Sequence, residues 1–151
     1  MKKPIIVIIS VIIIYIILVV IKRNDFINER NYLLDLDLEL KGIVDETVRL
    51  KQGHNFGVVR LDLIYSNIKT YDKRKERDNY FGVIKNNKLY IAVGNISYFE
   101  KGDIFTLKGI NYTIIRNDSI VEKNIYEMPY NIIDPYYEID PIINRMINDE
   151  D

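Results

Sequence analysis

The sequence predicts a mainly β protein: an N-terminal transmembrane helix, then a small antiparallel β-barrel or sandwich, then an extended Pro/Tyr-rich tail with a short C-terminal helix. One long apolar run near the N-terminus predicts the membrane helix. Short apolar runs separated by turn residues about every 8–12 positions predict the β-domain. We expect a transmembrane signal-anchor over 1–23, a stalk over 24–33, the β-domain over 34–125 and the tail over 126–151.

The anchor is predicted from the segment Ile5–Ile21, in which 16 of 17 residues are apolar and only Ser10 is not. A helix of this length spans roughly 25 Å at about 1.5 Å per residue. Lysine and arginine at both ends can reach the headgroups and make up the difference to a hydrocarbon core of about 30 Å. A cleaved signal would need a shorter apolar run followed by small residues, which residues 18–23 lack. We therefore expect an uncleaved, single-pass membrane protein that contacts lipid through residues 5–21.

The orientation of this anchor follows less directly from charge, because basic residues stand on both sides of the apolar run. Long domains are translocated largely regardless of the charge near the span. We expect a cytoplasmic N-terminus and an extracytoplasmic C-terminal domain.

The first half of the β-domain is predicted from alternation. Leucine alternates with charged residues over 34–41, which is typical of a strand with one solvated face. Gly42 then predicts a bulge or a bend, and the extended chain continues to Leu50. A turn is expected at 53–55, followed by a second strand over 56–65.

The second half of the domain reads as a series of hairpins. Strands are expected over 80–84 and 89–93 around the two-residue turn Asn86-Asn87. Turns at 101–103, 108–109 and 117–118 then separate strands over 104–107, 112–116 and 120–122. So many short strands are typical of a small antiparallel barrel or sandwich.

The tail over 126–140 contains closely spaced prolines, which favour an extended backbone. A helix is expected to begin with Asp140 as its N-cap and to end near Ile147. Tyr130, Tyr136 and Tyr137 form the candidate interaction surface, because tyrosine buries a large area at low entropy cost. The alternative is that these rings only attach the tail to the barrel.

Composition excludes several classes of site. The chain has no cysteine and one histidine, so disulfides, thiolate metal centres and multi-histidine metal sites are excluded. Residues 24–151 carry 17 Lys and Arg against 22 Asp and Glu, which argues against nucleic acid as a partner. We expect no cofactor, no metal and no catalytic residue.

Three further features could carry chemistry. The row Asp35, Asp37 and Glu39 could bind a hard cation, but we favour a solvated strand face that also discourages edge pairing. His54 stands in an expected loop without a nucleophile at a recognisable spacing. Acidic neighbours interrupt the basic cluster, which consists of Lys73, Arg74, Lys75 and Arg77.

One set of residues carries a resemblance to known proteins. After a strand-rich half with Gly57 and Gly82 come Gly102-Asp103, Lys108, Asn111 and Arg116. This stretch is similar to a segment of small uncharacterised bacterial envelope proteins, in which a Gly-Asp turn precedes a lysine and an arginine-ended strand. The resemblance covers roughly residues 40–120 and implies an N-terminal anchor and a small β-domain. This chain lacks the lipidated cysteine that some of those proteins have.

The sequence thus leads us to expect a membrane-anchored, non-catalytic binding or scaffolding module whose partner is another protein. The alternative is a β-barrel that recognises a small ligand, a polysaccharide or nucleic acid. That alternative would require an aromatic groove, for which the sequence offers Tyr65, Tyr80, Tyr90 and Tyr98. The sequence sets no oligomeric state.

Overall fold

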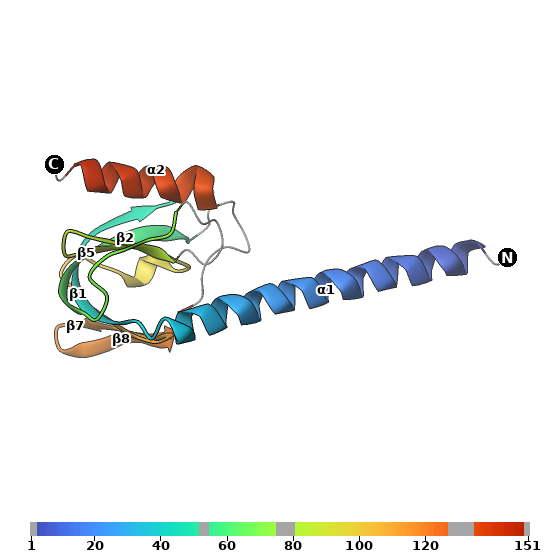
Figure 1. Ribbon diagram of the computed structural model, residues 1–151, viewed down its shortest axis with the longest axis horizontal. Helices are drawn as coiled ribbons and strands as arrows, with labels where there is room; N and C mark the ends of the chain where they lie inside the picture. Colours follow the sequence, from blue (N-terminus) through green and yellow to red (C-terminus); the bar gives the residue numbers. More distant parts are fainter. Residues whose placement is uncertain (1–2, 52–54, 75–80, 127–134, 150–151) are drawn as a thin grey trace.

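The computed structural model describes residues 3–51, 55–74, 81–126 and 135–149. One long helix enters a β-domain, and a second helix follows it (Figure 1). In chain order the elements are α1 (Lys3–Asp35), β1 (Glu39–Arg49), β2 (Gly57–Ser66), β3 (Tyr71–Asp72), β4 (Gly82–Lys85), β5 (Lys88–Val93), the 3-10 helix η1 (Ile96–Tyr98), β6 (Ile104–Lys108), β7 (Asn111–Arg116), β8 (Ser119–Ile125) and α2 (Pro135–Asn148).

The strands form one antiparallel sheet in the order β3-β4-β5-β2-β1-β6-β7-β8. The mainly β class is therefore confirmed. The expected barrel or sandwich is not what the structure shows, because the described strands form one open sheet with β3 and β8 as its two edges. Alternation of side chains reports which face of a strand is buried. It does not report whether the first and last strands pair, so closure could not be predicted from the pattern.

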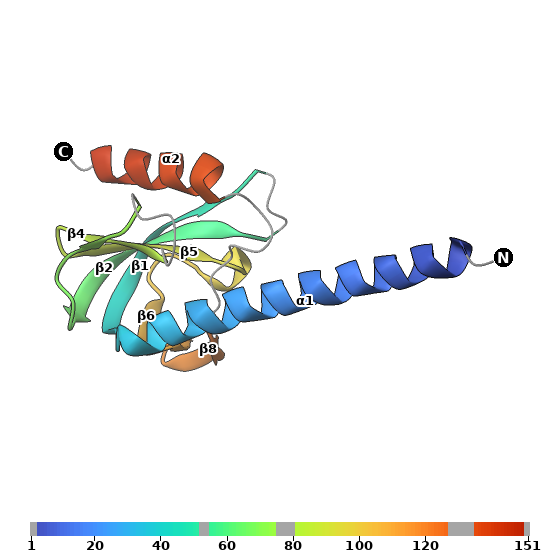
Figure 2. The same cartoon turned by 45° about the vertical axis from the view of Figure 1, so that its right-hand side comes forward.

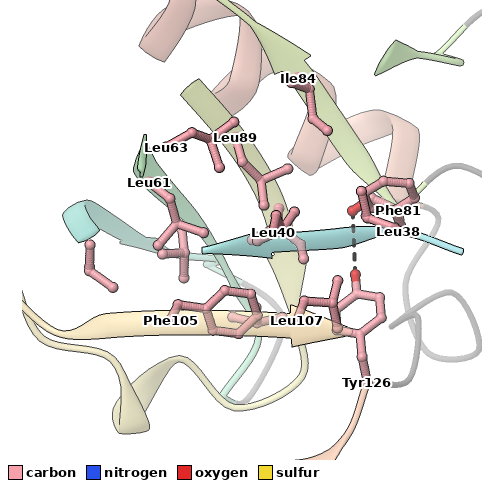
Figure 3. Packing of buried hydrophobic residues seen from close by; sticks show 14 of the residues in the cluster. Leu38, Leu40, Leu61, Leu63, Phe81, Ile84, Leu89, Phe105, Leu107 and Tyr126 are labelled. Atoms are coloured by element: carbon pink, nitrogen blue, oxygen red, sulfur yellow. Dashed lines mark hydrogen bonds between the residues drawn. The ribbon is translucent and has the colours of Figure 1, made fainter. Parts of the chain in front are cut away.

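The larger hydrophobic core lies on one face of this sheet and draws side chains from both halves of it (Figure 3). Leu61 and Leu89 come from the β5-β2 side, and Phe105 comes from the β6-β7 side; all three are fully buried. Tyr126, just after β8, donates a hydrogen bond from its hydroxyl to the carbonyl of Ala92 at 2.7 Å. It also reaches the carbonyl of Phe81 at 3.3 Å. This tyrosine therefore ties the end of one edge strand to the β4-β5 hairpin across the core.

Helix α1 continues into the domain without a break. Leu33 is buried in the core, and the hydroxyls of Tyr32 and Tyr71 lie 2.9 Å apart. The helix ends at Asp35, and the chain turns through Asp37, which has a φ of 43°. The prediction of a strand from residue 34 is therefore wrong for its first half. Four residues of alternating leucine fit a strand, but helical packing of Leu33 and a left-handed turn decide the local structure.

Strand β1 carries an irregularity at the predicted place. Its pairing with β2 shifts register between Lys41 and Gly42, so an irregularity lies at Gly42 as expected, although the extra residue is Ile64 on β2. A second shift lies between Val44 and Glu46, where the alternation gave no signal. Both shifts bend the sheet around the core, since a bulge increases local twist.

The hairpin turns are confirmed in detail. Asn86 and Asn87 have φ values of 51° and 60°, and Asn117 and Asp118 have 49° and 61°. Two consecutive residues with positive φ are the mark of a type I′ turn, which suits the twist of antiparallel strands and favours Asn and Asp. Strand β8 continues to Ile125, beyond the predicted end near Glu122.

Helix α2 lies across the other face of the sheet (Figures 1 and 2) and buries Ile139, Ile143, Met146 and Ile147 there. It begins at Pro135, so the extended chain expected up to residue 140 and the N-cap at Asp140 are wrong. Pro141 lies inside the helix. The tail is therefore docked where it is described, and residues 127–134 lie outside the described part of the chain.

Candidate functional site

The predicted interaction tyrosines are only partly placed. Tyr130 lies outside the described residues, and Tyr136 and Tyr137 lie in the first turn of α2. The side chains of these two are not described, so the expected tyrosine surface stays a prediction.

The acidic row does not share one strand face. Asp35 ends α1, Asp37 occupies the turn and Glu39 begins β1. Glu39 faces Lys108 at 3.6 Å. Among the residues that the structure describes, no three Asp, Glu or His side chains gather as metal ligands.

The basic cluster is likewise dispersed into local pairs where it is described. Arg74 contacts the carboxylate of Asp72 at 2.5 Å and the side-chain oxygen of Asn144 on α2 at 2.5 Å. Lys75 and Arg77 lie outside the described residues, as does His54. Nothing described here therefore tests a catalytic histidine.

The aromatic groove expected from four tyrosines is also not one surface. Tyr90 is buried against α2, and Tyr65 is exposed on β2. Tyr80 lies outside the described residues. Tyr98, 37% exposed at the end of η1, is the only one of the three described rings that lines a cavity at the open side of the core.

That cavity has a volume of about 280 Å³ and lies between the segment Val93–Phe99 and the strands β6, β7 and β8. Five aromatic side chains line it: Tyr98, Phe99, Phe105, Tyr112 and Tyr126. Tyr98 and Asn124 are exposed, so the cavity opens to solvent along that rim. We call it the aromatic cavity.

The rings of the aromatic cavity form a connected wall. The ring of Phe105 lies 5.8 Å from that of Phe99 and 5.8 Å from that of Tyr112, centroid to centroid. Aromatic pairs at this spacing attract each other and hold their rings in place. The wall therefore combines two strand residues, Phe105 and Tyr112, with Phe99 from the connection between η1 and β6.

The opposite wall is polar because of strand β8. On β7, Ile114 faces the core, and its partner across the ladder is Glu122; Tyr112 is likewise opposite Asn124. Partners across a ladder point to the same face of the sheet. The core face of β7 thus continues on β8 as a carboxylate and an amide, where an apolar residue would have closed the core.

Glu122 is half-buried, and it accepts a hydrogen bond from the amide of Asn124 at 3.1 Å. It is the only charged side chain among the described residues that line the cavity. Burial raises the pKa of Tyr112 to about 12, and the nearby charge of Glu122 and the nearby Tyr98 contribute to that rise. The ring of Tyr112 thus stands beside the one carboxylate of the described lining.

The rim of the cavity is fixed by Arg116 at the end of β7. Its guanidinium donates to the carbonyl of Tyr98 at 3.1 Å and to the buried carboxylate of Asp103 at 2.8 and 2.9 Å. Glu100 is the third partner, and its carboxylate accepts a hydrogen bond from the same guanidinium at 2.6 Å. These bonds connect η1, the turn before β6 and the β7-β8 hairpin, so Arg116 holds Tyr98 at the mouth of the cavity.

A second candidate feature is the exposed half of α1. Every large apolar side chain from Ile8 to Ile21 is between 48% and 68% exposed, and this part of the helix projects away from the β-domain (Figures 1 and 2). In the described part of the chain, no helix combines the length and the apolar character needed to cross a membrane. The span expected over residues 5–21 is not supported by that finding and stays a prediction from the sequence.

Sequence reasoning missed the aromatic cavity because its walls come from four separate segments. Only one local signal pointed to it. Glu122 and Asn124 alternate on a strand whose neighbours along the sheet present Tyr112 and Ile114 to the core. A polar pair on that face of an edge strand indicates an open or wet end of the core, but only once the strand register is known.

No family model, no curated protein and no solved structure matches this chain significantly. The resemblance to bacterial envelope proteins therefore stays a prediction.

Proposed function

We propose that the protein is a single-pass, membrane-anchored and non-catalytic binding module, held at a membrane surface by α1. The observation that carries this proposal is the exposure of the apolar half of α1. Its large side chains surround the helix on all sides between Ile8 and Ile21, and none of them is less than 48% exposed. An all-round apolar helix is stable when protein or lipid covers it.

Lipid accounts for this surface better than a partner helix does. A helix that packs against protein concentrates its apolar residues on one face, whereas lipid surrounds a helix evenly. The sequence extends the apolar run to Ile5 and places basic residues at both ends, which suits the headgroup regions. The core contacts of Leu33 then fix the β-domain to the anchor.

The second candidate function is recognition of a small ligand, and the aromatic cavity favours it over a protein partner. Its volume of about 280 Å³ is near the small end of ligand-binding sites, which run from about 300 to 1,000 Å³. The cavity is concave, and its lining combines aromatic rings with several polar groups that could orient a ligand. We therefore place ligand recognition in the β-domain and membrane attachment in α1.

Reporter fusions test the anchor and its orientation together. Helix α2 ends at the exposed Asn148, so a C-terminal fusion leaves the docked face of that helix untouched. We expect a reporter that works only outside the cytoplasm to be active, and one that works only inside to be inactive. The reverse result would place the β-domain in the cytoplasm. Both reporters working with a soluble fusion would contradict the anchor itself.

A further inference from the structure

The chemistry of the aromatic cavity narrows the class of ligand. Its walls offer five aromatic side chains, and its described lining contains one carboxylate, no lysine and no arginine. An anionic ligand would face the charge of Glu122 with no counter-charge. The faces of aromatic rings carry negative potential and attract cations, most strongly where water is excluded.

The carboxylate of Glu122 has no cationic partner among the residues that the structure describes. From these residues its side chain receives one hydrogen bond, from the amide of Asn124. The next residue, Lys123, is exposed and stands at the opposite face of the strand, because successive strand residues alternate. A half-buried carboxylate without a counter-ion is costly, and a bound cation would lower that cost.

The size of the cavity excludes large ligands. A space of about 280 Å³ holds a small head group with its methyl or methylene substituents. A folded protein segment or a polysaccharide chain would need a longer groove. A bare metal ion would leave the aromatic walls without a role, and its usual ligands are several oxygens.

We infer that the aromatic cavity binds a small organic cation, an alkylammonium or quaternary ammonium group, with Glu122 as its counter-ion and the rings of Tyr98, Phe99, Phe105 and Tyr112 as its walls. This inference rests on the ligand-binding role proposed above, and it does not depend on the anchor. The cation could be a free amine or the head group of a lipid, which share this chemistry.

The test is calorimetric titration of the full chain in uncharged maltoside micelles, with choline chloride as the probe. The control ligand is 3,3-dimethylbutan-1-ol, which has the shape of choline without its charge. We expect choline to bind at least about tenfold more tightly than the alcohol, since about 1.4 kcal/mol corresponds to a factor of ten. Sodium chloride at equal ionic strength should give no binding heat.

Three variants test whether choline binds in the aromatic cavity. Glu122→Gln keeps the shape of the side chain and removes its charge, so we expect choline affinity to fall about tenfold. Asp118→Asn makes the same change at an exposed position in the turn of the same hairpin and should leave affinity unchanged. Tyr98→Leu, at the exposed rim, should also lower the affinity for choline. It provides a second variant if Glu122→Gln unfolds the chain.

The outcomes separate the two proposals. Equal affinity for choline and the alcohol, unchanged by Glu122→Gln, would show that the cavity binds ligands but would overturn the cation. If neither choline nor the alcohol binds, both the cation inference and the proposed ligand-binding role are overturned. Bilayer discs then distinguish a free amine from a lipid head group as the source of the cation. Weaker choline binding in phosphatidylcholine discs than in phosphatidylglycerol discs would identify the lipid head group as the ligand, and equal binding would identify a free amine.

Discussion

Asp103 connects several segments of this fold through its hydrogen bonds. Its side chain is 2% exposed and accepts bonds from the guanidinium of Arg116 and from the backbone N–H of Glu100. Its own backbone carbonyl accepts from the N–H of Val44 on β1. The hydrogen bonds from Arg116 hold the pKa of this carboxyl below its usual range, although burial acts in the opposite direction.

This residue gives a prediction for the pH dependence of stability. A folded-state pKa below the unfolded value, which is about 3.9, stabilises the fold at higher pH. The contribution is complete above about pH 4 and is lost as the pH falls through the folded pKa. We therefore expect Asp103→Asn to lower the free energy of unfolding at neutral pH, and the difference from wild type to shrink in acid.

Urea unfolding of the full chain in micelles, followed by circular dichroism across this pH range, measures the effect. Asp118→Asn is the control, because Asp118 is exposed in the neighbouring turn. A constant difference between Asp103→Asn and wild type down to low pH would contradict the role of the ionised carboxylate.

The contact between Asp103 and Arg116 shows what a sequence can and cannot reveal about individual residues. Gly102-Asp103 and Arg116 stood out as the residues of the resemblance, but nothing in their spacing connected them. Only the pairing of β6 with β7 brings the two side chains together, since Ile104 stands opposite Ile115. Glu122 remained inconspicuous for the same reason. A contact between strands depends on register, which local patterns constrain weakly.

At the scale of elements, strands with strong turn signals were predictable, whereas the inner boundaries of the two helices were not. The hairpins around Asn86-Asn87 and Asn117-Asp118 formed as expected, because type I′ turns have a specific residue chemistry. At the start of the domain, four alternating leucines resembled a strand, although the first of them, Leu34, is helical and the second lies in the turn after the helix. Period two over so few residues does not outweigh the packing of a helix end.

The C-terminal helix was predicted, but its start was placed too late because of its prolines. Proline inside a helix costs about 3 kcal/mol, so the sequence favoured an extended chain up to Pro141. Burial of a large aliphatic side chain contributes about 1.5–3 kcal/mol. Four such side chains are buried between α2 and the sheet, Ile139, Ile143, Met146 and Ile147, and their spacing suits one helical face. Tertiary packing therefore outweighs the local preference.

The packing of α2 can be measured with one substitution. Ile143 is fully buried against the sheet, so we expect Ile143→Ala to lower the free energy of unfolding by about 3 kcal/mol. Asn148→Ala, at an exposed position near the end of the same helix, is the control and should change it by less than about 0.5 kcal/mol. Equal effects of the two substitutions would mean that α2 does not stabilise the domain.

At the scale of the whole molecule, the sequence predicted the mainly β class of the fold. It could not predict that the sheet stays open. The aromatic cavity exists because the core face of the sheet ends at a polar edge strand, with Tyr126 reaching across the core to the β4-β5 hairpin. Such features depend on contacts between distant segments, which no local pattern contains.

The arrangement of the molecule also gives α1 a mechanical role. Its final turns pack into the core through Leu33 and contact β3 through Tyr32, while its first half is exposed. Because α1 is continuous, it fixes the direction of its exposed half relative to the β-domain. If that half is the membrane anchor that we propose, α1 also holds the aromatic cavity at a set orientation to the membrane.

The decisive measurement is alkaline carbonate extraction of membranes from bacterial cells that express the full chain. We expect the wild type to stay in the membrane pellet. Ile12→Arg combined with Ile16→Arg should release the protein, because each arginine near the middle of a span opposes insertion by roughly 3 kcal/mol. The matched control, Ile64→Arg combined with Ile120→Arg, changes two similarly exposed side chains of the β-domain and should stay in the pellet. Wild type in the soluble fraction would contradict the membrane anchor.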